Sequence, residues 1–359
     1  MPKNLIRVPV LASMFFSFAT LPAQAAEPLK IGFVYVSPVG QAGWTFQHEQ
    51  GRQAMQRALG GQVESRFVEA VPEGADAERV MRDLASQGHT LIFATSFGYL
   101  EPALRVAADF SAVKFEHAGG YKTAPNLNTY NARFYEGRWL AGWLAGKTSK
   151  SGVAGYVAGF PVPEVVQGIN AFALGMREAN PKASVRVLWL NTWFDPPKER
   201  EAALALVGAG ADVLTHHSGS AAVPQAAEEK GVQLVAYQSD MRAQAPNAQL
   251  AAVTADWGDH YTRVAQSVLA GRWRAQPVWG GIKDGLVKLS GVSPAVSPAL
   301  RKELAAREQA LVAGKAGPFV GRLVDQAGVV RQERGTLADA DIARMDWFVQ
   351  GVSGTLPKP

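Results

Sequence analysis

The stretch KIGFVYVSPVGQAGWTFQHEQGRQAM, residues 30–55, decides the fold class of this chain. Its first part, residues 30–36, is an apolar run rich in β-branched and aromatic side chains, which is typical of a buried strand. A turn with proline and glycine follows, and the chain then enters a helix that we predict from Trp44 to Leu59, ended by Gly60. A strand that leads through a short turn into a helix is the first half of a βαβ unit.

The same alternation of strands and helices continues along the chain. We predict further strands at residues 90–95, 113–117, 153–158, 185–190, 212–216, 232–237 and 251–254. We predict the remaining helices at residues 76–86, from Pro102 onward, and at 136–147, 163–179, 196–208, 223–230, 260–270 and 300–312. Asp76 is the expected N-cap of the helix at 76–86, and Gly88 lies just past its end. Repeated βα units predict parallel sheets that are covered by helices on both faces.

Two successive doubly wound units predict two α/β lobes, with the change from one to the other near residues 129–133. The helix at 260–270 is expected to return to the first lobe. In doubly wound sheets a ligand binds at the carboxyl ends of the strands. The loops at these ends are residues 37–44, 96–99, 119–121, 160–164, 191–195, 216–218 and 238–241. They combine aromatic rings with amides, hydroxyls and single acids, a mixture that suits a flat polar molecule.

The N-terminus has the layout of a secretory signal peptide. Lys3 and Arg7 precede an apolar run, and Ala23-Gln24-Ala25 forms a small-x-small cleavage site. The apolar run is shorter than the roughly 20 residues that span a bilayer. The chain contains no cysteine, so no disulfide, thiol nucleophile or lipid-anchoring cysteine is available. We therefore expect a soluble periplasmic protein whose mature chain starts near Ala26.

Charge and motifs exclude several classes of function. Loss of Lys3 and Arg7 with the signal peptide leaves 34 basic residues against 31 acidic ones, and this weak, scattered excess does not favour nucleic-acid binding. The sequence contains no G-x-S-x-G, H-E-x-x-H or P-loop motif. His216 and His217 are neighbours on a predicted strand, so they point to opposite faces and do not chelate one metal. We expect no catalysis, no metal and no cofactor.

Several long stretches resemble one family. Besides residues 30–55, they are LIFATSFGYLEPALRVAADF (91–110), VKFEHAGGYKTAPNLNTYNARFYEGRWLAG (113–142), VPEVVQGINAFALG (162–175) and NTWFDPPKEREAA (191–203). These stretches resemble the basic membrane protein (BMP) family of ABC-transporter substrate-binding proteins, and the resemblance covers roughly residues 30–287.

The resemblance implies a type I periplasmic-binding-protein fold, with two Rossmann-like lobes joined by a three-strand hinge. The expected lobes are residues 26–129 with 255–279, and 130–254 with 280–359. Family members bind purine nucleosides or related nucleobases. The motifs TSFGY, WFDP and SDM resemble those of a family branch that is associated with purine bases such as adenine.

The resemblance also suggests ligand-binding residues, each with a structural alternative. Trp44 and Trp193 would supply one ring from each lobe to sandwich a purine, although a tryptophan at such a strand end also serves as a packing residue. Asp240 would accept a hydrogen bond from the ligand, or else act as a turn or cap carboxylate. Ser96 and Phe97 are further candidates for ligand binding, and packing within the turn is their alternative role. Seven further residues are candidates for ligand binding, with a hinge, capping or ion-pair role as the alternative. They are Gln238, Tyr121, Lys283, Glu116, Asn131, Glu164 and Asn170.

The leading interpretation is a monomeric periplasmic receptor that captures a purine nucleobase or nucleoside by closing its lobes. It would deliver the ligand to an inner-membrane ABC permease with a separate ATPase. Two alternatives are a periplasmic nucleoside hydrolase and a receptor that signals its ligand state to a membrane sensor.

Overall fold

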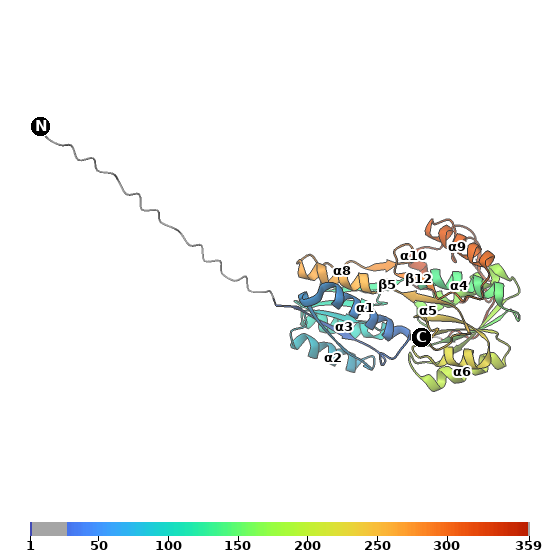
Figure 1. Cartoon of the computed structure of the whole chain (residues 1–359), viewed down its shortest axis with the longest axis horizontal. Helices are drawn as coiled ribbons and strands as arrows, with labels where there is room; N and C mark the ends of the chain where they lie inside the picture. Colours follow the sequence, from blue (N-terminus) through green and yellow to red (C-terminus); the bar gives the residue numbers. More distant parts are fainter. Residues whose placement is uncertain (2–26, 358–359) are drawn as a thin grey trace.

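The strands form two large sheets of mainly parallel strands, and helices cover the faces of each sheet. The sheets with their helices lie side by side as two lobes in the computed structural model (Figure 1). The structure describes Met1 and residues 27–357. The predicted signal peptide therefore lies, apart from Met1, outside the described residues. None of the helices in the described part is long and apolar enough to cross a membrane.

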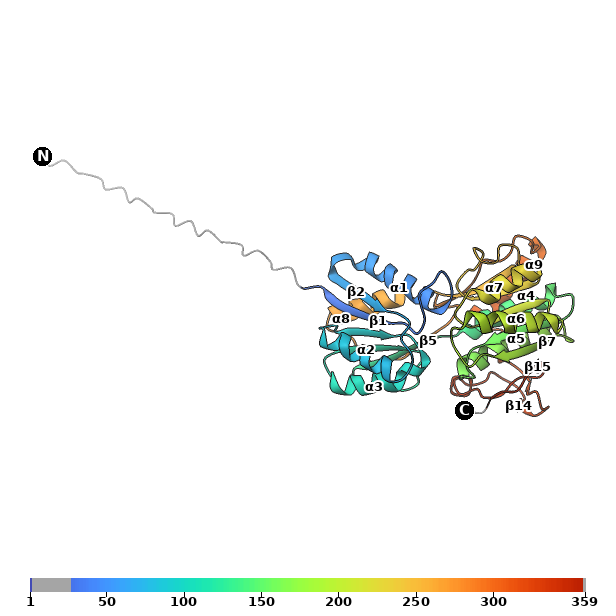
Figure 2. The same cartoon turned by 90° about the horizontal axis from the view of Figure 1, so that it is seen from below.

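The sheet of the first lobe is parallel throughout and has the order β11-β5-β4-β3-β1-β2. Its strands are β1 (Leu29–Val34), β2 (Val63–Val68), β3 (Leu91–Ala94), β4 (Lys114–Ala118), β5 (Leu127–Ala132) and β11 (Val278–Gly280). Its helices are α1 (Gly43–Leu59), α2 (Ala75–Ser86), α3 (Leu100–Asp109) and α8 (Gly258–Leu269), with the short 3₁₀ turns η1 (Gly60–Gln62) and η2 (Phe97–Tyr99). Figure 2 shows α1 and α8 on one face of this sheet and α2 and α3 on the other. Both faces are therefore buried, which explains the continuous apolar runs of β1 and β3.

The sheet of the second lobe has the order β12-β10-β9-β8-β6-β7-β15, and only β12 is antiparallel to its neighbour. Its strands are β6 (Val153–Ala158), β7 (Ser184–Trp189), β8 (Val213–His217), β9 (Gln233–Gln238), β10 (Gln249–Ala255), β12 (Val287–Ser290) and β15 (Val352–Ser353). The helices are α4 (Phe134–Thr148), α5 (Pro163–Ala179), α6 (Pro196–Gly208), α7 (Ala222–Lys230), α9 (Pro298–Val312) and α10 (Asp339–Ile342). A small hairpin of β13 (Leu323–Val324) and β14 (Val330–Gln332) lies in the C-terminal segment.

Helices α4 and α5 pack against each other at van der Waals distance through glycines. A Cβ on Gly142 would lie 2.1 Å from the carbonyl oxygen of Phe172, and a Cβ on Gly175 would lie 2.1 Å from that of Trp139. No larger residue fits at either position without a shift of backbone, so these glycines set the distance between the two helices.

The described chain passes between the two sheets in three places: from β5 into α4, from β10 into α8, and from β11 into β12. The helix predicted to return to the first lobe is α8, and it packs against α1. The carboxyl ends of both sets of parallel strands consequently face the space between the lobes.

Several strands were not predicted, and one helix cap was predicted wrongly. The strands missed include β2, β5, β11 and β12. In the edge strand β2 (Val63–Val68) half of the side chains are polar and only Val63 is buried. The N-cap of α2 is Gly74, not Asp76, which lies inside the first turn where its charge still favours the positive end of the helix.

Candidate functional site

A pocket lies between the lobes, at the carboxyl ends of the parallel strands, with an empty volume of about 610 Å³ that includes the part open to solvent. The first lobe lines it with Val36, Ser37, Trp44, Ser96, Phe97, Ala118 and Gly119. The second lobe lines it with Val162, Glu164, Trp193, His217, Ser218, Gly219, Tyr237 and Gln238. The lining carries aromatic rings, hydroxyls, one carboxylate and one amide, and no lysine or arginine.

Trp44 forms the aromatic wall of the first lobe. It lies in the first turn of α1 and is half-buried, with its indole Nε1 donating a 2.6 Å hydrogen bond to the carbonyl oxygen of Thr95. Its ring meets the His48 ring edge-on at 4.3 Å between centroids, and His48 stacks on Trp257 in turn. These contacts fix the orientation of the Trp44 ring while leaving part of it open to the pocket.

Trp193 forms the corresponding wall of the second lobe. It lies in the loop between β7 and α6, is half-buried, and meets Phe160 edge-on at 4.9 Å between centroids. The ring rests directly over Gly159, where an added Cβ would lie 2.7 Å from an indole carbon. Each lobe therefore contributes one indole to the pocket.

Gln238 supplies a polar group at the end of β9. Its side chain is 1% exposed, and neither its amide oxygen nor its amide nitrogen has a hydrogen-bond partner within the described residues. Its backbone adopts a φ of 68°, which is rare for a residue other than glycine. Buried amides are nearly always paired, and strained backbone gathers at functional sites. Gln238 thus offers a donor and an acceptor side by side to a bound molecule.

Glu164, His217 and Tyr237 form a polar group beside it. One carboxylate oxygen of Glu164 accepts a hydrogen bond from the Tyr237 hydroxyl at 3.2 Å and lies 3.3 Å from Nε2 of His217. Burial lowers the pKa of His217, so the ring is neutral at pH 7. Nδ1 of His217 has no hydrogen-bond partner in the described part of the chain.

A buried arginine lies behind this group. Arg138 on α4 is fully buried, and its guanidinium carbon lies 3.7 Å from the centre of the Tyr237 ring. It donates to the hydroxyl of Thr215 at 2.7 Å and to the carbonyl oxygen of His216 at 2.5 Å. Its guanidinium packs on the face of the Tyr237 ring and does not itself reach the pocket lining.

The structure brings together five of the eight residues expected from the sequence. Trp44, Ser96, Phe97, Trp193 and Gln238 all line the pocket.

The other three, Tyr121, Asp240 and Lys283, are not part of its lining. Tyr121 is 66% exposed beside Phe97, and Lys283 is exposed in the crossing from β11 to β12.

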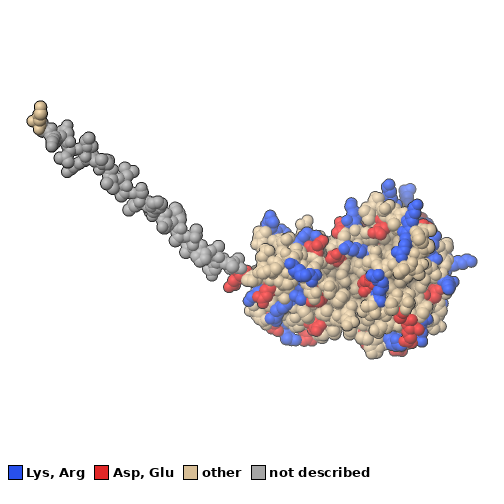
Figure 3. All heavy atoms as spheres, in the orientation of Figure 1, with Lys and Arg blue, Asp and Glu red and all other residues tan. Residues whose placement is uncertain are grey.

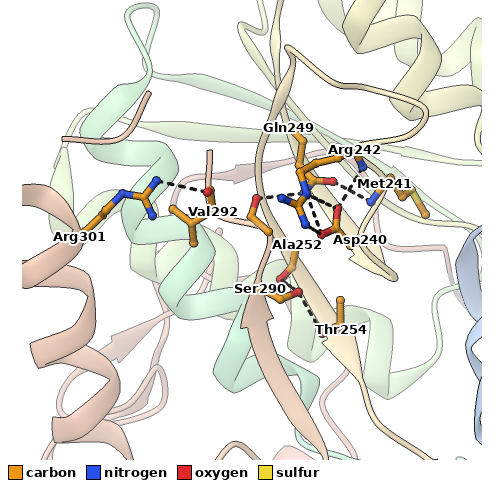
Figure 4. A network of polar contacts seen from close by, with 10 residues as sticks. Asp240, Met241, Arg242, Gln249, Ala252, Thr254, Ser290, Val292 and Arg301 are labelled. Atoms are coloured by element: carbon orange, nitrogen blue, oxygen red, sulfur yellow. Dashed lines mark hydrogen bonds and ion pairs between the residues drawn. The ribbon is translucent and has the colours of Figure 1, made fainter. Parts of the chain in front are cut away.

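Asp240 is held by its own neighbours (Figure 4). Its carboxylate accepts hydrogen bonds from Arg242, at 2.9 and 3.0 Å from Nε, and from Nε2 of Gln249 at 2.9 Å. Partial burial of Asp240 raises its pKa, but these hydrogen bonds outweigh that effect and lower the pKa below its ordinary value. The geometry is that of a turn carboxylate, which was the alternative to a ligand-binding role.

Among the additional candidates, only Glu164 reaches the pocket lining. Glu116 is buried against Trp273 and Asn128, and Asn170 binds backbone groups of the C-terminal segment. The sequence reasoning missed His217 and Tyr237 as site residues, although both lie at the carboxyl ends of β8 and β9 where such residues were sought. Within the described residues, no group of three or more histidines and acids is placed to hold a metal.

The Bmp family model, described as PnrA-like ABC-transporter substrate-binding proteins, matches residues 29–315. The chain belongs to this family. The Bmp-family chain is 47% identical to a purine-binding protein of Brucella abortus (strain 2308) over 94% of its own length and 96% of the relative. It is also 37% identical, over 92% of its length and 82% of the relative, to a protein of Haloferax volcanii that is named as a glucose-binding protein of an ABC transporter.

Solved structures confirm the predicted type I periplasmic-binding-protein fold of this Bmp-family protein. A solute-binding protein of an ABC transporter system from Conexibacter woesei superimposes with a TM-score of 0.66, at 22% identity, over 80% of this chain and 97% of that one. A solute-binding protein from Aeropyrum pernix K1 gives a TM-score of 0.68, at 18% identity, over 80% of this chain and 92% of that one. Its membership of the Bmp family identifies the chain as an ABC-transporter substrate-binding protein.

Proposed function

We propose that this Bmp-family protein captures a purine base, or a nucleoside containing one, in the pocket between its lobes and delivers it to an ABC permease. The observation that carries the proposal is the buried Gln238 amide, whose two polar atoms have no partner among the described residues, in a pocket bordered by Trp44 and Trp193. A purine has flat faces for indole rings and an edge that presents a donor beside an acceptor. The purine-binding name of the Brucella abortus relative supports this choice.

The charge of the lining narrows the ligand class. The residues around the pocket include the Glu164 carboxylate but no lysine or arginine. A phosphate or carboxylate group on the ligand would meet a like charge without a cation to balance it. We therefore propose a neutral base or nucleoside rather than a nucleotide.

We propose that binding is not followed by chemistry. Hydrolysis of a nucleoside would need a general acid or base directed at the glycosidic bond. The Glu164 carboxylate already accepts a hydrogen bond from Tyr237, and the ring of His217 lies beside it. Incubation of the protein with adenosine should release no adenine, as followed by chromatography.

The ligand class is tested by calorimetry with adenine, adenosine and glucose, together with the variant Gln238→Leu. Wild-type protein is expected to bind a purine and to bind glucose far more weakly. Gln238→Leu keeps the size of the side chain but leaves two polar atoms of the ligand edge unpaired, so affinity for the purine should fall by about 1–3 kcal/mol. Gln276→Leu, at an exposed position between α8 and β11, is the matched control and should bind normally. Preference for glucose over both purines would overturn the proposal.

We propose that the protein reaches the periplasm by way of a cleaved signal peptide, acts there as a soluble monomer, and depends on a separate ATPase for transport. On the face shown in Figure 3, acidic and basic side chains are interspersed over both lobes, in keeping with the weak net charge. We further propose that the two lobes, with boundaries near residues 129, 255 and 279, close around the ligand by a hinge motion.

The export proposal predicts the start of the mature chain. Expression with the full N-terminus should yield a soluble envelope protein that begins near Ala26, because the Ala23-Gln24-Ala25 site is cleaved. Intact-mass spectrometry of the protein from the envelope fraction measures this directly. Material from that fraction that still begins at Met1 would contradict it.

A further inference from the structure

One carboxylate oxygen connects the two lobes at the rim of the pocket. Glu73 lies in the loop between β2 and α2 of the first lobe. Its Oε1 accepts hydrogen bonds from the hydroxyl of Ser96 at 2.6 Å and from the backbone N–H of Gly98 at 2.8 Å. The same oxygen accepts a third hydrogen bond, at 3.2 Å, from the indole Nε1 of Trp193 in the second lobe.

The surrounding backbone is shaped to admit this carboxylate. A Cβ on Gly98 would lie 2.4 Å from the carboxyl carbon of Glu73, so any residue larger than glycine there displaces the carboxylate. Ser96 and Trp193 line the pocket, whereas Glu73 itself does not. Glu73 therefore acts on a bound molecule indirectly, through Ser96 and Trp193, which donate hydrogen bonds to it.

Another contact between the lobes has a different character. The backbone N–H of Gly43, at the start of α1, donates a 2.8 Å hydrogen bond to the hydroxyl of Ser239 in the second lobe. A Cβ on Gly43 would lie 2.4 Å from the carbonyl oxygen of Gly219. There the lobes meet through backbone groups and one hydroxyl, without a charged group. Glu73 is the charged contact, and charge-assisted hydrogen bonds are stronger than neutral ones.

We propose that Glu73 is a positioning residue that orients the Trp193 ring and the Ser96 hydroxyl together when the lobes are in contact. It thereby links the aromatic wall of the second lobe to the pocket loop of the first and slows release of the ligand. This inference rests on the proposed purine-binding function, because it assigns Trp193 a face of the ligand.

The test measures association and dissociation rates of adenine by stopped-flow fluorescence, on the full mature protein. Glu73→Ala removes the common acceptor and should speed dissociation about 3- to 10-fold, with little change in the association rate. Glu73→Gln keeps an acceptor oxygen but loses the charge, so it should release adenine at a rate between those of wild type and Glu73→Ala. Glu101→Ala is the matched control, because Glu101 is an exposed glutamate of the same lobe that pairs only with Lys122.

A double-mutant cycle separates positioning across the lobes from a local structural role. Trp193→Phe keeps an aromatic face but removes the N–H that reaches Glu73, so it should also speed dissociation. In the double variant with Glu73→Ala the effect should be no larger than the greater single effect, because both changes break the same contact. Multiplication of the two single effects, or a wild-type rate in Glu73→Ala, would overturn the inference. If wild-type protein binds no purine at all, the proposed function fails first, and that outcome is distinct from either of these.

Discussion

Acidification from pH 7 to 5 is expected to cost the folded protein roughly several kcal/mol of stability. All six histidines of the chain are buried, and burial lowers the pKa of each below the ordinary value. The pKa falls to about 3 for His117 and His216 and to about 4 for His260. For His216 a second cause is the positive charge of Arg138. The folded chain therefore keeps these rings neutral under conditions in which exposed histidines take up protons.

The sign of the effect follows from proton uptake. An unfolded histidine is protonated below about pH 6.5, whereas these rings stay neutral in the folded state until a much lower pH. Unfolding therefore binds protons in this window, and the stability that is fully present above about pH 6.5 is lost as the pH falls. Each such histidine contributes at most about 1.4 kcal/mol per pH unit, an upper limit that local hydration of the ring reduces. Glu116 acts in the opposite direction, because burial raises its pKa to about 7, and it offsets roughly one histidine.

Denaturant unfolding at pH 7, 6 and 5 measures this dependence. His117→Gln removes one titrating group and should make the pH dependence of the unfolding free energy shallower by about one proton. The substitution breaks no side-chain hydrogen bond, because neither ring nitrogen of His117 has a partner in the described structure. Gln62→His adds a histidine at an exposed position, where it titrates alike in both states, and should leave the slope unchanged. Equal unfolding free energies at pH 7 and pH 5 would show that the histidines become hydrated in the folded protein.

The fold could be predicted from the sequence where local pattern and burial agree. The strands at β1 and β3 are buried on both faces, so their apolar runs are unbroken and easily recognised. The edge strand β2 has one exposed side and reads as a polar loop. The same reasoning placed Gln238 correctly at a strand end, because the carboxyl ends of the parallel strands are defined once the strands are known.

The site was less predictable where a side chain's partners lie elsewhere in the chain. Asp240 looked available for a ligand, but Arg242 and Gln249 occupy its carboxylate, and only the local geometry reveals this. Glu73 gave no sequence signal at all. Its contact with Trp193 joins residues 120 positions apart across two lobes, and no periodicity or motif encodes such a pair.

The largest loss of ligand binding is expected when both indole walls are removed. Trp44→Ala and Trp193→Ala should each weaken binding of adenine by about 1–3 kcal/mol, the usual value of a base stacked on an aromatic ring. Because the two rings lie in different lobes and are not in direct contact with each other, the effects should be close to additive in the double variant. The summed loss of roughly 2–6 kcal/mol would raise a micromolar Kd to between about 30 μM and about 20 mM, and the upper part of this range lies beyond detection by calorimetry.

Stability and a third tryptophan provide the controls for this prediction. Trp189 lies at the end of β7, stacked on Phe348 and outside the pocket lining, so Trp189→Ala should bind adenine normally even if the fold is weakened. Trp44 also donates to Thr95 and packs on His48, so Trp44→Ala is expected to lower the melting temperature somewhat more than Trp193→Ala. Wild-type affinity in both single variants would exclude the sandwich. A large fall in melting temperature with unchanged affinity would instead assign the rings to packing, because a stacking face contributes to the bound state and a packing face to the folded state.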